Sequence, residues 1–192
     1  MKVVEFMGMP RAGKSTHKEL IETFLKHEKK VLTRNIYEGA RICPIDKNNR
    51  FLYNAWSFHN TMNRVIESKE QKFDYLLIDR GVYDHMAFTQ ALYKKDYITK
   101  SQFQAQIKYF KEFKFLEEIA LVFLVTPEES LRRENVNHTY RGRVMNDSFL
   151  SALHESYKEI LPKIAMDYYI IDGSKKLAEN KKEITDFIVG KE

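Results

Sequence analysis

The 192-residue chain has a single cysteine, Cys43, and only seven glycines, four prolines and one tryptophan. One cysteine cannot form a disulfide within the chain, which excludes a disulfide-stapled scaffold and fits a reducing compartment. Charged residues interrupt every apolar run well before the roughly 20 residues that a membrane-spanning helix needs. The chain has no repeat, no linker rich in Pro, Gly or Ser, and no secretion-signal pattern at its start. We therefore expect one cytoplasmic domain over residues 1–192, with no membrane partner.

The surplus of positive charge is small, with 32 basic against 27 acidic residues and a net charge of +5. Such a surplus fits small anionic substrates, and a solubilising surface accounts for most of the lysines. No recognised nucleic-acid-binding motif accompanies the charge, so nucleic acid is not an expected partner. His59 and His85 lack the paired His/Cys spacing of a metal centre.

Short apolar runs of strand length alternate with helical patterns along the chain. The runs lack polar alternation, which is typical of parallel strands covered on both faces. The expected strands are 3–7, 31–33, 75–78, 120–125 and 168–171. The expected helices are about 15–29, 51–68, two within 84–116, one after Pro127 with Thr126 as N-cap, 146–166 and 177–189. This order predicts an α/β fold, a three-layer sandwich around a five-stranded parallel sheet, of the P-loop NTPase type.

A complete G-x-x-x-x-G-K-S phosphate-binding loop lies between the first strand and the first helix. Its backbone N–H groups and the helix N-terminus can surround a polyphosphate anion. Lys14 is expected to reach the β- and γ-phosphates of ATP, and the Ser15 hydroxyl to bind Mg²⁺. The expected nucleotide contacts of the loop are Gly8, Met9, Pro10, Arg11, Ala12, Gly13, Lys14, Ser15 and Thr16.

Asp79 and Arg80 follow the apolar strand at 75–78. A carboxylate at this strand end is where P-loop enzymes hold Mg²⁺, so Asp79 is the second candidate metal contact. Arg80 suits a phosphotransferase, which uses a cation there to hold an acceptor. A surface ion pair is the other interpretation of Arg80.

A cluster of arginines without lysine covers residues 131–143. Guanidinium groups favour bidentate phosphate contacts, so the cluster predicts a lid over about 132–146 that closes on ATP. A solvated basic helix end is the alternative. The arginines concerned are Arg132, Arg133, Arg141 and Arg143.

The polar stretch from 35 to 50 is expected to begin a substrate-facing segment over about 35–70. Its candidate acceptor-binding residues, besides Arg80, are Arg34, Glu38 and Arg41. Flat apolar side chains on which a nucleobase could stack are Tyr37, Phe51, Tyr53, Trp56 and Phe58. Trp56 and Phe58 fit core packing as well.

With these features the chain resembles the thymidylate kinase and deoxynucleoside kinase group of P-loop kinases. The resemblance rests on GMPRAGKS at 8–15, IDRG at 78–81, the arginine-bearing segment after TPEESLRRE, and IDGS at 171–174. It implies that Asp79 lies near Mg²⁺, Arg80 near a substrate phosphate, and that Arg11 takes part in transfer. Further implied contacts are Arg141 and Arg143 with ATP phosphates, Arg132 or Arg133 near adenine, and Asp172, Gly173 and Ser174 beside the base.

The departures from that group all fall on the acceptor side. Pro10 stands where thymidylate kinases have a carboxylate, and Gly81 where the group commonly has an aromatic residue. The second strand leads into Thr33-Arg34-Asn35-Ile36 instead of Arg-Glu-Pro. Deoxynucleoside kinases use a glutamate after this strand as general base, and Glu38 is the nearest candidate, displaced within the motif. The acceptor therefore stays open.

We expect an ATP- and Mg²⁺-dependent phosphotransferase whose catalytic residues are Lys14, Arg11, Asp79, Arg80, Arg141 and Arg143. Its partner would be a small acceptor, a nucleoside or nucleotide, and a homodimer is left open. A regulatory ATP-binding switch is the main alternative, because Pro10 removes an expected acceptor contact. A nucleic-acid end kinase is a third reading, based only on the basic balance and the lid arginines.

Overall fold

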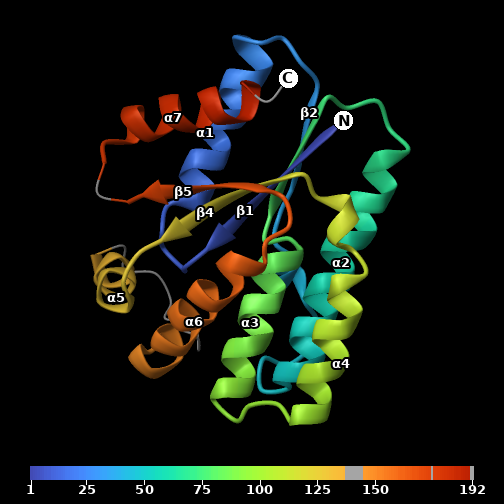
Figure 1. Cartoon of the computed structure of the whole chain (residues 1–192), viewed down its shortest axis with the longest axis vertical. Coiled ribbons are helices and arrows are strands. Elements are labelled where there is room, and N and C mark those ends of the chain that lie inside the picture. The colour runs from blue at the N-terminus through green and yellow to red at the C-terminus, as the bar shows by residue number, and fades with distance from the viewer. Residues whose placement is uncertain (137–144, 174, 191–192) are drawn as a thin grey trace.

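The computed structural model describes residues 1–136, 145–173 and 175–190. Five parallel strands form one sheet in the order β2-β3-β1-β4-β5 (Figure 1). The strands are β1 (Lys2–Gly8), β2 (Thr33–Ile36), β3 (Tyr75–Asp79), β4 (Ile119–Leu124) and β5 (Asp167–Asp172). The chain crosses from β1 over β3 to β2 and later returns past β1 to β4, so the order reverses beside β1. Ligands of such sheets bind at the carboxyl ends of the strands near this reversal.

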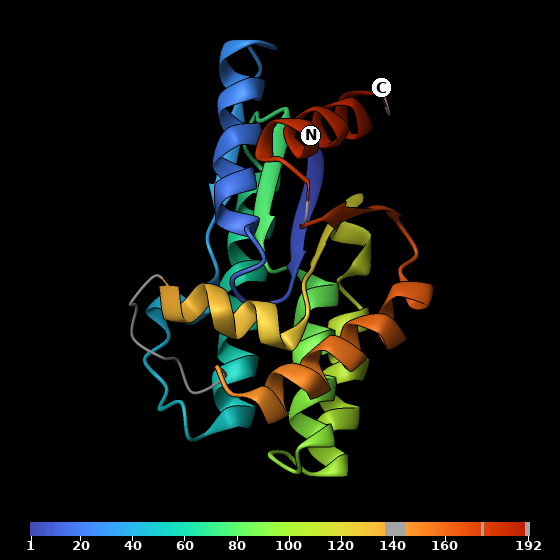
Figure 2. The ribbon, with the colours of Figure 1, turned by 90° about the vertical axis from the view of Figure 1, so that its left-hand side faces the viewer.

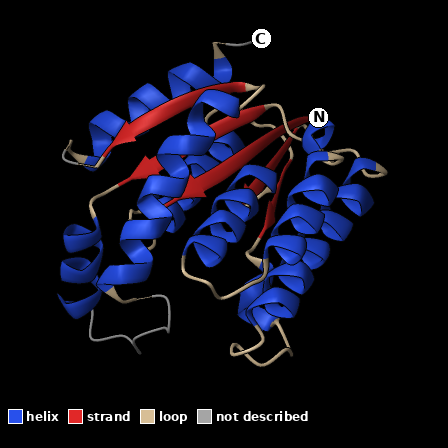
Figure 3. Ribbon diagram, turned by 60° about the horizontal axis from the view of Figure 1, so that its bottom comes forward, coloured by secondary structure: helices blue, strands red, loops and turns tan. Residues whose placement is uncertain are grey.

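Helices cover both faces of the sheet, as the three-layer prediction requires. α1 (Lys14–His27) and α7 (Leu177–Val189) lie together on one face, whereas α2 (Arg50–Lys69), α3 (Val82–Lys94), α4 (Lys100–Lys111) and α6 (Asp147–Ile160) lie on the other (Figures 1 and 3). α5 (Pro127–Val136) runs beyond the carboxyl ends of the strands, close to the loop after β1 (Figure 2). Short 3₁₀ helices cover Gly39–Ile42, Lys114–Leu116 and Leu161–Lys163. None of the described helices is long and apolar enough to cross a membrane.

The central strands are buried almost throughout, because their apolar runs meet helices on both sides. Val4 of β1 is opposite Leu77 of β3 and Ile119 of β4. The edge strand β5 differs, since Tyr168 and Ile170 are 40% and 47% exposed. Its other face packs on α7, where Tyr169 contacts Phe187. The expectation of burial on both faces is therefore wrong for this edge strand.

Most element boundaries agree with the prediction to within two residues, but β2 and α6 differ by more. β2 begins at Thr33, where pairing with Tyr75 starts, and not at residue 31; Leu32 before it is 61% exposed. α6 ends at Ile160 rather than near 166, because Pro162 cannot continue the helix and Leu161–Lys163 turns as a 3₁₀ helix. The Thr126 cap is confirmed, as its hydroxyl accepts from the Glu129 N–H at 3.2 Å.

A buried pair of carboxyl groups supports the start of α3. Glu5 of β1 accepts from the N–H groups of Gly81 and Asp84, each at 2.9 Å, and Glu117 accepts from the N–H of Val82 at 2.8 Å. Burial raises the pKa of Glu5 to about 7 and the pKa of Glu117 well above its ordinary value. Glu5 raises the pKa of Glu117 further, because two carboxylates buried side by side repel each other.

The same pair explains the glycine in IDRG. A Cβ on Gly81 would lie 2.0 Å from Glu117 Oε1 and 2.9 Å from the Glu5 carboxyl carbon. The two carboxyl groups fill the space that an aromatic residue at this position would need. Gly81 therefore fixes how closely the start of α3 approaches β1.

Candidate active site

The loop after β1 forms a cradle whose shape depends on two glycines. Gly8 has φ +133, and a Cβ there would lie 2.1 Å from the Phe123 carbonyl oxygen of β4. Gly13 has φ +95 and directly precedes α1. The Met9 N–H donates to the Phe123 carbonyl at 2.9 Å, which ties the loop to the sheet. The first turn of α1 therefore directs its free N–H groups into the cradle.

Lys14 is buried beneath this loop. Its Nζ donates to the carbonyl oxygens of Gly8 at 2.9 Å and Met9 at 2.8 Å. Burial and the nearby Arg80 lower the pKa of Lys14 to about 8, although Asp84, Asp79 and Glu38 act in the opposite direction. Lys14 is thus mostly charged near physiological pH, but it loses its proton at a lower pH than an exposed lysine does.

A cavity of about 690 Å³, here called the loop cavity, opens over the phosphate loop. Asp79 is buried there, and its Oδ2 lies 3.7 Å from both Lys18 Nζ and Arg41 Nη2. The loop cavity is lined by residues 10–16 together with Glu38, Arg41, Asp79, Arg80, Arg133, Glu134 and Met145. Ser15 and Asp79, predicted to contact a metal, thus share one cavity.

Arg80 is the centre of a buried charge network at the end of β3. Its Nη1 donates to Asp84 Oδ2 at 2.7 Å and to the Gly8 carbonyl at 3.3 Å. Glu38 Oε1 lies 3.0 Å from Arg80 Nε, an ion pair in which the Nε–H is not directed at the carboxylate. Burial alone would lower the pKa of Arg80, but Asp84 and Glu38 hold it well above its ordinary value. The guanidinium is therefore permanently charged and held in place.

Asp84, which sequence reasoning missed, ties this network to the phosphate loop. Its Oδ1 accepts from the Gly8 N–H at 2.9 Å and lies 2.7 Å from the Tyr157 hydroxyl. That hydroxyl is also 2.9 Å from the Gly8 carbonyl, and its single proton serves one acceptor at a time. Burial would raise the pKa of Asp84, but Arg80 and Lys14 outweigh burial and lower it. The signal in the sequence was the i, i+4 spacing of Arg80 and Asp84 at the start of a helix.

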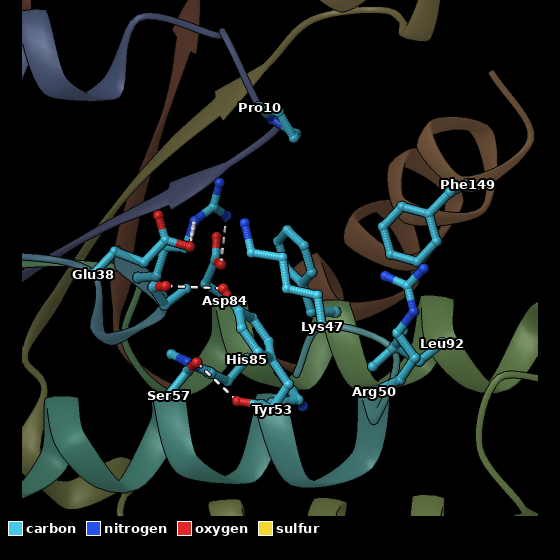
Figure 4. Close-up of a pocket in the computed structure, with 14 residues that line it drawn as sticks. Pro10, Glu38, Lys47, Arg50, Tyr53, Ser57, Asp84, His85, Leu92 and Phe149 are labelled. Carbon is cyan, nitrogen blue, oxygen red and sulfur yellow. Dashed lines mark hydrogen bonds and ion pairs between the residues drawn. The ribbon is translucent and has the colours of Figure 1, made fainter. Parts of the chain in front are cut away.

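A second cavity, of about 230 Å³, is enclosed by α2, α3 and the first turn of α6, and is here called the helix cavity (Figure 4). It combines a charged end at Glu38, Arg80 and Asp84 with apolar walls. Its lining is Pro10, Glu38, Ala40, Lys47, Arg50, Tyr53, Asn54, Ser57, Arg80, Asp84, His85, Phe88, Leu92 and Phe149. Most of these were not predicted, because they come from three helices that only the tertiary fold brings together.

The candidate arginines are spread over different places. Arg11, with φ +57, pairs through its Nε with the buried Glu134 of α5, and Arg133 lines the loop cavity and donates to the Gly173 carbonyl at 3.3 Å. Arg132 is instead bound to Glu129 at 2.6 Å and lines neither cavity.

Two further predicted residues line neither cavity, and three others, with most of the predicted lid, lie outside the described part of the chain. Arg34, predicted to bind the acceptor, lines neither cavity, because its Nη1 donates to Gln71 Oε1 at 2.6 Å near the end of α2. The Asp172 carbonyl accepts from Asn180 at 2.9 Å, and Asp172 also lines neither cavity. Some predictions fall outside the described residues: most of the lid at 132–146, with Arg141 and Arg143, and Ser174.

The aromatic candidates lie partly in the core and partly near the cavities. Phe58 belongs to the core, stacked on Phe110 with ring centroids 3.9 Å apart. Tyr53 lines the helix cavity and donates from its hydroxyl to the Ala40 carbonyl at 2.8 Å. Tyr37 lies over Lys18, whose Nζ is 4.3 Å from the ring centroid, on the side of the loop cavity.

The sheet order and the phosphate loop after β1 define the fold of the P-loop kinases, as the resemblance predicted. No family model matches the chain, and no curated protein matches it by sequence. Its fold is similar to solved structures of deoxyadenosine kinase from M. mycoides.

Three of those structures illustrate the likeness. The one with bound dATP has a TM-score of 0.74 and 12% identity, covering 98% of this chain and 100% of that chain. The one with the products dCMP and a flexible dCDP has a TM-score of 0.78 and 13% identity, covering 98% and 99%. The one with bound dCTP has a TM-score of 0.72 and 15% identity, covering 98% and 99%. At these identities the likeness shows the fold.

Proposed function

We propose that this protein transfers the γ-phosphate of ATP to a hydroxyl group of a nucleoside, as a nucleoside kinase. The observation that carries this proposal is that Pro10, Glu38 and Arg80 line both cavities. A triphosphate in the loop cavity and an acceptor in the helix cavity would thus meet at the Glu38 carboxylate and the Arg80 guanidinium. Such a juxtaposition of two substrates is what phosphoryl transfer requires.

A neutral acceptor fits this junction better than a phosphorylated one. Both charged groups at the shared wall are already engaged, because Arg80 pairs with Asp84 at 2.7 Å and with Glu38 at 3.0 Å. Glu38 adds a negative charge beside the entering group, which would repel an acceptor phosphate. One of the similar structures contains dCMP as a product, and a monophosphate product also supports a nucleoside as the acceptor.

In this mechanism the side chains mainly position charge. The loop N–H groups and Lys14 hold the triphosphate, Glu38 accepts the hydroxyl proton, and Arg80 orients the acceptor and offsets charge at the transferred group. Arg11 and Arg133 line the loop cavity, each paired with a glutamate, Glu134 and Glu129 respectively. Phe88 and Phe149 supply apolar walls for the base.

Mg²⁺ fits the donor set at Ser15 and Asp79. No group of three or more His, Cys, Asp or Glu within the described parts of the chain could hold a metal. That agrees with Mg²⁺ chemistry, because this ion is usually held by one or two protein oxygens together with phosphates and water. Ser15 would bind it directly and Asp79 through water, and the ion would neutralise charge on the triphosphate.

The test is a screen of acceptors by ATP consumption, with the product identified by mass. We expect at least one deoxynucleoside to be converted to its monophosphate, and a Lys14→Ala variant to be folded but inactive. ATP consumption that needs no acceptor would instead support a regulatory ATPase. Phosphorylation of oligonucleotide ends alone would support a nucleic-acid end kinase, and either result would overturn the proposal.

ATP binding should take up a proton, because the pKa of Lys14 is about 8 in the nucleotide-free protein and phosphates favour the charged ammonium. Above pH 8, Lys14 of the nucleotide-free protein is increasingly uncharged, and ATP must then bind together with a proton. ATP affinity should therefore fall by up to tenfold per pH unit. Calorimetry at pH 8.5 in two buffers of different ionisation enthalpy should show a net uptake of more than half a proton.

A Lys14→Arg variant is the matched control, since arginine stays charged over this range and should take up no proton. Equal binding heats for the wild type in the two buffers would contradict the prediction.

A further inference from the structure

The backbone between β3 and α3 is strained at Arg80. This residue has φ +65, a left-handed conformation that a long side chain rarely adopts. Its N–H donates to the Phe6 carbonyl of β1 at 3.1 Å, and its side chain lines both cavities. Strain of this kind persists only where the surrounding contacts hold it in place. The contacts next to Arg80 therefore decide whether its guanidinium stays at the junction of the two cavities.

The first turn of α3 is capped by two glutamates from distant parts of the chain. Gly81 occupies the N-cap position and has no side chain that could accept a hydrogen bond. Glu5 Oε1 accepts from the N–H groups of residues 81 and 84, each at 2.9 Å, and its Oε2 accepts from that of Tyr83 at 3.4 Å. Glu117 Oε1 accepts from the Val82 N–H at 2.8 Å. Every N–H from residue 81 to residue 84 thus donates to one of these two carboxyl groups.

The two carboxyl groups form a pair that retains protons more strongly than exposed carboxyl groups do. Both side chains are buried, and the negative charge of Asp84 lies nearby. Burial and Asp84 raise the pKa of Glu5, and burial and Glu5 raise the pKa of Glu117. Tyr83 also faces the pair, and burial raises the pKa of its hydroxyl. One negative charge suits the start of a helix, but two side by side repel each other.

We propose that Glu5 and Glu117 are positioning residues of the transfer reaction, because by holding the first turn of α3 they set where Arg80 and Asp84 stand. Asp84 in turn binds the Gly8 N–H at 2.9 Å and Arg80 at 2.7 Å, so a shift of this turn moves the phosphate-loop contact and the guanidinium together. Neither glutamate lines a cavity, so both act only through α3. The inference rests on the proposed function, since it takes Arg80 as the group that orients the acceptor.

Two replacements of Glu5 test the hydrogen bonds. Glu5→Met keeps the length of the side chain but cannot accept, whereas Glu5→Gln keeps one accepting oxygen. With saturating ATP and nucleoside, Glu5→Met should lower kcat roughly 10- to 100-fold, the effect of a small misplacement of a group that orients a substrate. KM for ATP should change only a few-fold, because Lys14 and the loop N–H groups hold the triphosphate. Glu5→Gln should restore kcat to within a few-fold of the wild-type value.

The matched control is Glu118→Met, the same replacement at the exposed neighbour of Glu117, which should leave kcat unchanged. Circular dichroism establishes that each variant is folded at the assay temperature. Equal losses of kcat in folded Glu5→Met and Glu5→Gln would contradict the hydrogen-bonding argument.

A pH profile of Glu117→Gln tests the pair without removing a cap. Its amide oxygen can accept from the Val82 N–H, and its NH₂ group can donate to Glu5, so this variant should fold even if Glu5→Met does not. Wild-type kcat at saturating substrates should fall at alkaline pH, as the pair loses its protons and the first turn of α3 loosens. Because the amide cannot ionise, the fall in Glu117→Gln should move to higher pH by about one unit or more. Lys14 does not contribute to this difference, since bound phosphates keep it charged.

The outcomes separate this inference from the function on which it rests. Acceptor-dependent ATP consumption by the wild type, with wild-type kcat in a folded Glu5→Met protein, would overturn the positioning role and leave the kinase standing. If Glu5→Met does not fold, the pH profile decides, and equal profiles for the wild type and Glu117→Gln would overturn the role of the pair. No acceptor-dependent consumption by the wild type would overturn both proposals.

Discussion

Replacing Glu38 by glutamine should lower kcat for phosphoryl transfer to a nucleoside by roughly 10²- to 10⁴-fold, the usual contribution of a general base. Glu38 lines both cavities, and its Oε1 lies 3.0 Å from Arg80 Nε. Glutamine keeps the size and can still contact Arg80, but it cannot take the hydroxyl proton. KM for ATP should stay within a few-fold of the wild-type value, since Lys14 and the loop N–H groups hold the triphosphate.

The division between kcat and KM distinguishes catalysis from simple support of Arg80. If Glu38 only held Arg80, glutamine would raise KM for the nucleoside and change kcat little. Asp46→Asn is the matched control, because Asp46 lies in the same connection and caps only the local Asn48 N–H at 2.8 Å. If kcat of Glu38→Gln lies within threefold of the wild-type value, Glu38 is not the general base.

Replacing Asp84 by asparagine should lower the free energy of unfolding by roughly 3–5 kcal/mol, the effect of breaking a buried ion pair from one side. Asp84 is fully buried and accepts from Arg80 at 2.7 Å and from the Gly8 N–H at 2.9 Å. Among the described residues, asparagine leaves Arg80 with Glu38 as its one remaining ion-pair partner. Its new NH₂ group must also face a donor, which is either Arg80 Nη1 or the Gly8 N–H. Urea unfolding monitored by circular dichroism measures the loss.

The pH dependence of that loss has a definite sign. The pKa of Asp84 is lowered in the folded protein from an ordinary value of 3.8, so its stabilisation is present above pH 3.8. It is lost as the pH falls further and the carboxylate takes up a proton. The difference in the free energy of unfolding between wild type and Asp84→Asn should therefore shrink in acid.

Tyr157→Phe, which removes one hydroxyl from the same site, should lower the free energy of unfolding by only about 1 kcal/mol. A similar loss from both variants would contradict the ion-pair argument.

The elements that the sequence predicted well are those with a local signal. The phosphate loop has a fixed spacing, and the buried strands β1, β3 and β4 have apolar runs that only Glu5 of β1 interrupts. β2 was displaced by two residues because its four residues include Arg34 and Asn35, and its pairing with β3 decides where it starts. Asp84 and Asn54 were missed because their roles depend on contacts with residues 35 to 76 positions away in the chain.

Other expectations stay predictions. They include the single domain over 1–192, the lid over 132–146, the homodimer and the cytoplasmic location. The acceptor-facing segment at 35–70 supplies seven residues to the lining of the helix cavity, and α3 supplies four more without having been predicted to do so.

One helix carries both ends of the helix cavity. α3 holds Asp84 against the phosphate loop, and five residues further along its Thr89 hydroxyl accepts from Asn54 of α2. The rise of an α-helix is fixed, so the span between these two contacts cannot stretch. α3 therefore sets a fixed separation between the phosphate loop and the far wall of the helix cavity.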